Sequence, residues 1–357
     1  MDKAARIVDM RKLDPSQKRA IVMGLMYPAL TVTGGPGTGK STVQRILFTA
    51  INLYESRVER EKPMRSLISQ WADSEDGPSY SLISAACPTG KGAVRLAEAS
   101  GEHASTVHRQ IGARKEGGCS FNADKPIPAA VVATDEFSMM DTETSMRQMV
   151  AIDSRASMVL IGDDNQLTSV GPGQVLRDII DSGIMPTAKL GRTHRPGKES
   201  GIPVVAERIL AGLYPFEEGE ELRGCKHINV SDARAMDDIL QLVSDDIVMQ
   251  GLSPDTDIIV MSPMRNGAIG VVRCNNAIKN AINPITDDPT THPFELAENG
   301  TELIINEVVM NLENNDAIQV MNAECGIGSR FTEGPELNKE GNPTGRMPDT
   351  PGTEFGS

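Results

Sequence analysis

Several features that would place a chain of 357 residues in other classes are scarce or missing. Aromatic residues make up only 3% of the sequence, so its cores must be built mainly from Val, Ile, Leu, Ala and 18 Met. No apolar stretch is long enough to cross a bilayer, and the N-terminal MDKAARIVDMRKLD lacks the apolar run of a secretory signal. These absences predict a cytoplasmic protein without a membrane span.

Cysteine and positive charge are also limited. The five cysteines are far apart and never form a Cys-x-x-Cys pair, which argues against a disulfide framework and a zinc site. Residues 1–130 carry a formal charge of +5 and residues 131–357 carry −19, which together give the net −14. Because Lys and Arg supply most non-specific affinity for nucleic acid, any such contact is expected to be local and to lie in the first segment.

The order of apolar runs predicts an α/β fold. Short β-type runs alternate with longer helical stretches, the pattern of a parallel sheet covered by helices on both faces. Ligands of such open sheets bind at the carboxyl ends of the strands, and each run here leads into a loop with a chemically suggestive residue. The predicted strands are 29–34, 81–88, 129–136, 156–163 and 257–263.

Residues 34–42 read GGPGTGKST and match the phosphate-binding pattern GxxxxGK[ST], between a predicted strand and the helical segment VQRILFTAINLY. Glycines let backbone N–H groups turn toward phosphates, and the following helix adds its dipole. Lys40 is expected to reach the β- and γ-phosphate oxygens, and Ser41 to offer its hydroxyl to Mg²⁺. The predicted nucleotide-binding residues of this P-loop are Gly34, Gly35, Pro36, Gly37, Thr38, Gly39, Lys40, Ser41 and Thr42.

A second nucleotide element requires an acidic residue at the end of another strand. Asp135 and Glu136 follow the run AAVVAT and meet this requirement. We expect Asp135 to hold Mg²⁺ and Glu136 to act as general base on the attacking water. The alternative interpretation of such a pair is a solvated turn or a helix cap.

Together with several further segments, these motifs resemble the RecD-like helicases of superfamily 1, over about residues 13–325. LDPSQKRAI, from Leu13, is similar to the family's adenine-side motif, which implies that Gln17 hydrogen-bonds the base. Asp14 followed by Pro15 fits an ordinary capped helix start equally well.

Two further segments, ACPTGKGAVRLAE and STVHR, are similar to family segments that line the single-strand track. The resemblance implies that Thr89, Lys91, Thr106 and His108 bind DNA, as donors to its phosphates. His108 taken alone would more simply be a structural histidine.

The remaining motifs complete the resemblance. DEFSMM resembles the family's DEASM with Phe137 as a departure, and in GDDNQLTSVGPGQVLRD the position of Gln166 implies contact with the γ-phosphate. LGRTHRPGKESGI places Arg195 where a family arginine reaches the γ-phosphate across the domain cleft, although Pro196 replaces the usual Gln. A surface salt bridge is the alternative role of Arg195.

The resemblance divides the chain into parts. It implies a RecA-like ATP-binding motor domain at 1–188, with 112–128 as a hairpin insertion that splits the duplex. Residues 189–330 are expected to form a partial second RecA-like domain and the start of a small β-barrel, and the polar segment 331–357 to be disordered. The family's C-terminal motor motifs are not found.

Two functions follow from these expectations. The first is an ATP-dependent 5′–3′ DNA helicase of RecD type, or a truncated portion of one, with ATP, Mg²⁺ and single-stranded DNA as ligands. Its expected partners are other subunits of a repair, recombination or conjugation complex. The alternative is a vestigial helicase-like module that binds single-stranded DNA or a protein partner without motor activity.

Overall fold

The computed structural model describes residues 12–57, 82–114, 116–191, 200–217, 219–231, 234–252 and 257–282, and short strands at 294–296, 301–303, 308–310 and 325–327. The chain divides into two compact units, residues 1–217 and 218–357. The predicted domain boundary after residue 188 therefore lies within the first unit. No helix of the described ranges has both the length and the apolar character needed to span a membrane.

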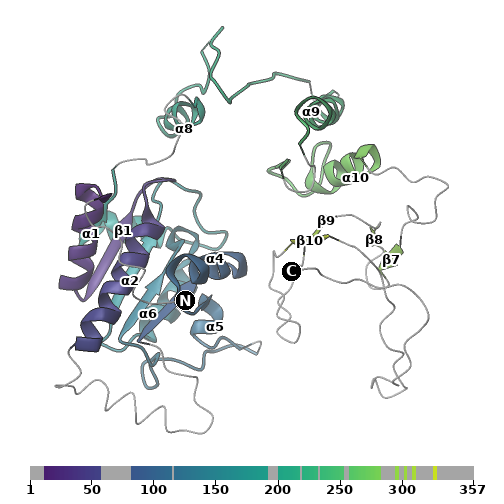
Figure 1. Ribbon diagram of the computed structural model, residues 1–357. Coiled ribbons are helices and arrows are strands. Elements are labelled where there is room, and N and C mark those ends of the chain that lie inside the picture. Colours follow the sequence, from purple (N-terminus) through teal and green to yellow (C-terminus); the bar gives the residue numbers. More distant parts are fainter. Residues whose placement is uncertain are drawn as a thin grey trace, which may run out of the picture. The chain divides into compact units, whose positions relative to one another are not determined.

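A six-stranded sheet forms the centre of the first unit (Figure 1). Its strand order is β3-β2-β4-β5-β1-β6, and neighbouring strands pair in parallel. The four inner strands are buried along most of their length, as expected for a sheet covered on both faces. The strands are β1 (Ala29–Thr33), β2 (Ile83–Cys87), β3 (Ala104–Thr106), β4 (Val131–Thr134), β5 (Ser157–Gly162) and β6 (Thr187–Lys189).

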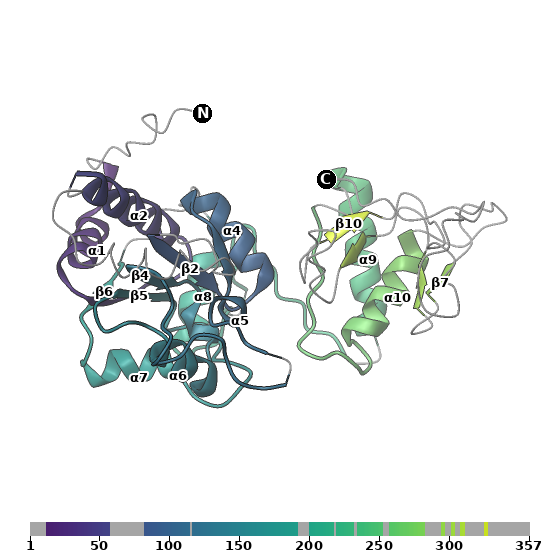
Figure 2. The same cartoon turned by 90° about the horizontal axis from the view of Figure 1, so that it is seen from below.

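Helices cover both faces of this sheet. Figure 2 shows α1 and α2 on one face and α6 and α7 on the other. Apolar residues of α1, α2 and α4 form one core cluster with β1 and β2, whereas α7 and the 3-10 turn η3 pack around a second cluster that includes Phe137 and Leu160. The helices of the first unit are α1 (Pro15–Met26), α2 (Lys40–Arg57), α4 (Gly90–Ser100), α5 (Val107–Gln110), η3 (Phe137–Met139), α6 (Thr142–Val150), α7 (Val175–Ser182) and α8 (Ile202–Leu210), of which α8 has no buried residue.

This arrangement confirms the predicted α/β P-loop fold in the first unit. The P-loop lies between β1 and α2, as the motif requires. Phe137, a departure from the family motif, is fully buried in the second core cluster, together with Leu160 of β5 and Leu176 of α7. The core of the first unit therefore accommodates the larger side chain of Phe137.

The predicted hairpin insertion at 112–128 contains an isolated antiparallel bridge between Ala113 and Cys119. The loop is closed by hydrogen bonds from Ser120 N to the Gly112 carbonyl, 2.9 Å, and from Phe121 N to the Ile111 carbonyl, 3.2 Å. Phe121 and Cys119 pack against a small buried cluster, so this loop is anchored to the body of the first unit. Its use in splitting a duplex stays a prediction.

In the second unit, α9 (Ala235–Gln250) and α10 (Val271–Ile282) pack against each other. Its described strands form two antiparallel pairs, β7 (Phe294–Leu296) with β8 (Thr301–Leu303) and β9 (Val308–Met310) with β10 (Cys325–Ile327). The barrel expected near this last pair and the partial motor domain stay predictions. The segment 331–357 lies outside the described residues.

The predicted strand at 257–263 is wrong. The segment has no strand assignment and pairs with no other described segment. Ile259 and Met261 are 83% and 88% exposed, so the apolar residues that suggested a strand are not buried. A strand is stable only when its backbone groups are paired and one face is covered, and this run has neither support.

Candidate nucleotide and DNA site

The P-loop connects the end of β1 to Lys40, the first residue of α2. Gly37 and Gly39 have φ values of 76° and 90°, a left-handed region that side chains disfavour. At Gly39 a Cβ atom would also collide with the side-chain amide of Gln17. Glycine at this position thus permits both the turn and the close approach of α1.

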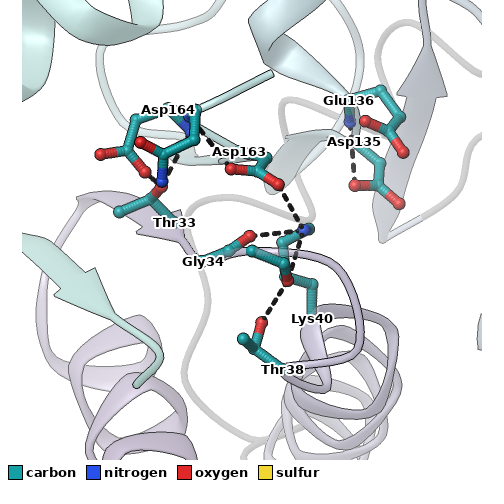
Figure 3. Close-up of polar contacts among 10 residues, drawn as sticks. Thr33, Gly34, Thr38, Lys40, Asp135, Glu136, Asp163 and Asp164 are labelled. Carbon is teal, nitrogen blue, oxygen red and sulfur yellow. Dashed lines mark hydrogen bonds and ion pairs between the residues drawn. The ribbon is translucent and has the colours of Figure 1, made fainter. Parts of the chain in front are cut away.

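Lys40 is held at the loop by backbone carbonyls and lies near a buried carboxylate. Its Nζ donates to the carbonyl of Gly34 at 2.6 Å and to that of Gly35 at 3.3 Å (Figure 3). The Oδ2 of Asp163, a residue only 1% exposed, lies 4.0 Å from the same Nζ. The ammonium is thus held at the P-loop by acceptor oxygens, the same kind of partner that phosphate oxygens would provide.

Gln17 links helix α1 to the P-loop. Its Oε1 accepts from Asp14 N at 3.2 Å, and the Asp14 side chain accepts from Gln17 N at 3.0 Å, which completes a capping box. Its Nε2 donates to the Thr38 carbonyl at 3.0 Å. The helix-cap interpretation is therefore realised, and the same side chain also supports the P-loop. The adenine contact stays a prediction.

Asp135 and Glu136 follow directly after β4. Burial raises the pKa of Asp135 to about 6, and the nearby Glu136 carboxylate also acts to raise it. The hydrogen bond from Glu136 N at 2.9 Å and the charge of Lys40 act to lower it. Glu136 has φ 50°, the one positive φ of a non-glycine residue in the described ranges. Such strain persists only where the surroundings impose it, and it is common at functional sites.

A cavity of about 420 Å³ joins these residues to the start of α4. Ser41, Asp135, Glu136 and Gln166 line it together with Thr89 and Lys91. The structure thus brings the candidate metal ligands, the candidate base and two of the candidate DNA contacts to one cavity. Oxygen ligands of this kind suit Mg²⁺.

The other candidate DNA residues lie apart from this cavity. Thr106 caps α5, with its Oγ1 accepting from Arg109 N at 3.3 Å, and His108 is exposed. Thr89 plays the same local part in α4, where its Oγ1 accepts from Gly92 N at 3.1 Å. The Thr106 hydroxyl keeps its own hydrogen for a further bond, whereas the Thr89 side chain also hydrogen-bonds the Cys87 thiol and acts to lower its pKa. Arg195 lies outside the described residues.

Two acidic residues at the end of β5 were missed as site candidates. Oδ2 of Asp163 lies 4.0 Å from Nζ of Lys40, and Asp164 accepts from Thr33 Oγ1 at 2.6 Å (Figure 3). Burial acts to raise the pKa of Asp164, but the Thr33 hydrogen bond and Lys189, 3.5 Å away, hold it below its ordinary value. The sequence contains a pattern that could have indicated them, because Asp163 and Asp164 are consecutive acidic residues at a strand end, like Asp135 and Glu136.

Comparisons with known proteins find similarity to helicases. Residues 17–172 match the AAA domain family. The RecBCD enzyme subunit RecD of Mycobacterium tuberculosis is 28% identical over 365 residues, covering 90% of this chain and 57% of that protein. The ATP-dependent RecD2 DNA helicase of Deinococcus radiodurans is 28% identical over 272 residues, covering 75% of this chain and 33% of that protein.

Among solved structures, a Bacteroides Pif1 helicase in complex with ADP-AlF3 and ssDNA gives a TM-score of 0.48 at 15% identity, covering 97% of this chain and 81% of that chain. The chain spans 57% of the length of the Mycobacterium relative. The curated relatives confirm the resemblance to RecD-like helicases that the sequence motifs predicted.

Proposed function

We propose that this homologue of the RecD helicases is an ATP-dependent DNA helicase, or a portion of one, that binds ATP with Mg²⁺ and moves 5′ to 3′ on single-stranded DNA. The observation that carries the proposal is the shared cavity. The predicted base Glu136 and the predicted metal ligands Ser41 and Asp135 line it with Thr89 and Lys91. A site of this composition can place ATP chemistry beside a DNA backbone.

In the proposed reaction Lys40 exchanges the P-loop carbonyls for β- and γ-phosphate oxygens. Ser41 and Asp135 hold Mg²⁺, which when bound neutralises charge on the phosphates. Glu136 takes a proton from the attacking water, and Gln166 contacts the γ-phosphate. Arg195 is proposed to stabilise the charge that develops there in the transition state. Gln17 is proposed to contact the adenine base through the second N–H of its Nε2 or the second lone pair of its Oε1.

The DNA strand is proposed to contact the carboxyl edge of the sheet through Thr89, Lys91, Thr106 and His108. The two threonines and the histidine donate to phosphates, and the Lys91 ammonium supplies charge. Because the first unit holds all four residues, binding is expected to be local, in keeping with the net charge of −14. Further subunits of a repair, recombination or conjugation complex are proposed as partners.

The test is ATP turnover with and without single-stranded DNA, in the wild type and in Lys40→Ala. We expect DNA to stimulate the wild type, and Lys40→Ala to lose turnover on the order of a hundredfold or more, because the phosphates lose their positioning cation. Duplex substrates with a 5′ or a 3′ tail then test the direction of movement. Stimulated turnover that survives Lys40→Ala would contradict the proposal.

One observation favours the alternative, a helicase-like module without motor activity. The described strands of the second unit form two antiparallel pairs, whereas the parallel sheet lies in the first unit. Movement along DNA requires two domains that close and open around ATP. Binding of single-stranded DNA without any wild-type ATP turnover would support this alternative.

A further inference from the structure

Gln44 occupies a position on α2 that faces the candidate catalytic residues. It follows Ser41 by three residues and Lys40 by four, so the three side chains share one face of the helix. Gln44 lines the same cavity as Asp135 and Glu136, and it is only 1% exposed. The Gln44 side chain is therefore part of the cavity wall and not of the solvated surface.

The amide of Gln44 is buried without a hydrogen bond. Its Nε2 has no partner in the part of the chain that the structure describes. A buried donor without a partner destabilises a fold, whereas an apolar side chain of the same shape would not. An unpaired amide at this place, in the wall of a cavity, indicates a partner that is engaged only when the site operates.

Glu136 offers the complementary group. Its Oε2 is also buried and also has no hydrogen-bond partner among the described residues. The other unpaired side-chain atoms of the described ranges, on Ser138, Ser145 and Gln148, belong to residues that do not line the cavity. One unpaired donor and one unpaired acceptor thus line a single cavity.

The backbone of Glu136 gives an independent reason to look for a second support. Its φ of 50° fixes where the side chain leaves the backbone. Neither that backbone strain nor the bond from Glu136 N to Asp135 orients the Glu136 carboxylate itself. A general base must point at the proton that it removes, so the carboxylate requires its own hydrogen-bond donor.

We propose that Gln44 is a positioning residue for ATP hydrolysis. When ATP and Mg²⁺ fill the cavity, Nε2 of Gln44 donates to Oε2 of Glu136 and turns the carboxylate toward the attacking water. The proton passes from the water to Glu136, and Gln44 exchanges no proton. This inference rests on the proposed ATP hydrolysis and adds a residue that acts through the base.

The first test is Gln44→Met, which keeps the length of the side chain and removes the donor. We expect kcat for ATP to fall about tenfold while KM and the affinity for a fluorescent ADP analogue stay within about twofold. The midpoint of thermal unfolding should not fall, because an unpaired buried amide has been replaced by an apolar group. The matched control is Asn52→Leu on the same helix, which removes the amide that donates to Glu102 at 2.7 Å and should leave kcat unchanged.

Gln44→Glu is the second variant. It keeps the size of the side chain but places a negative charge beside Glu136, so we expect a greater loss of kcat than with Gln44→Met. Three results with Gln44→Met would overturn the inference. These are an unchanged kcat, a loss of nucleotide affinity as large as the loss of kcat, or a lower midpoint of thermal unfolding. The last result would show that the Gln44 amide has only a structural role. A wild type without ATP turnover would instead refute the proposed function and this inference together.

Discussion

At Asp135, burial raises the pKa from 3.8 to about 6, so ionisation of this carboxyl group opposes folding. Between these two pH values the unfolded chain has released the proton while the folded chain still holds it. The free energy of unfolding therefore falls as the pH rises from 3.8 to about 6, and this effect is constant above that range. The shift of about two pKa units corresponds to about 3 kcal/mol.

Asp135→Asn should abolish this pH dependence. In the absence of Mg²⁺ we expect the variant to exceed the wild type by about 1–3 kcal/mol in free energy of unfolding at pH 7, with the gap closing toward pH 4. Urea unfolding at several pH values measures it. Asp153→Asn is the opposite control, because hydrogen bonds from Arg155 lower the pKa of Asp153 to about 2 and its loss should destabilise at neutral pH. An Asp135→Asn gap that does not change with pH would rule out this origin.

The places of some site residues could be predicted from the sequence, and those of others could not. The P-loop motif fixed the position of Lys40, and the strand ending before Asp135 fixed the acidic pair. The bond from Gln17 to the Thr38 carbonyl joins segments 21 residues apart, and no local pattern encodes it. Gln44 looks like a solvated helix residue in the sequence, because its burial depends on the packing of α2 against other elements such as α4.

Gln148 joins several elements through one buried side chain. From α6, its Nε2 donates to Gln110 Oε1 at 2.6 Å and to Thr134 Oγ1 at 2.7 Å. Gln110 in turn donates to the Ser84 carbonyl at 3.0 Å, so the bonds connect α5, α6, β4 and β2. Thr134 directly precedes Asp135. This network ties the predicted DNA segment near α5 to the strand that carries the candidate metal ligand.

Gln148→Leu should leave the buried oxygens of Gln110 and Thr134 without a donor. We expect the free energy of unfolding to fall by about 2–4 kcal/mol, since each unpaired buried group costs about 1–3 kcal/mol. Chemical denaturation gives the value. Glu143→Gln on the same helix is the control, because its ion pair with Arg147 is largely solvent-exposed and should contribute little. If both variants unfold at the wild-type denaturant concentration, the network has no structural role.

At the level of elements, the sequence predicted the four inner strands and missed the two at the edges. Runs such as those of β1 and β5 are rich in β-branched and apolar residues because helices cover both of their faces. The edge strands β3 and β6 have three residues each and are too short to produce a pattern. Residues 257–263 show the opposite error, since an apolar run becomes a strand only when a neighbour pairs with it.

Over the whole molecule, charge is divided unequally between the two units. Residues 1–217 carry a formal +1 and residues 218–357 carry −15, which together make the net −14. All four candidate DNA residues belong to the first unit. Because the second unit is joined to the first through the chain, its negative charge is expected to oppose binding of a DNA strand, and salt is expected to weaken this effect by screening, with a Debye length of about 10 Å at 0.1 M.

Removal of residues 218–357 should strengthen binding of single-stranded DNA at low salt. We expect the fragment 1–217 to bind an oligonucleotide about three- to tenfold more tightly than the full chain at about 50 mM salt, and the difference to narrow at about 200 mM. Fluorescence anisotropy measures both, after circular dichroism shows that the fragment is folded. Lys91→Ala should weaken DNA binding by the fragment and by the full chain alike, because the proposed phosphate contact of Lys91 is present in both. Tighter binding by the full chain would mean that the second unit contributes contacts that outweigh its charge, and the electrostatic argument would then be wrong.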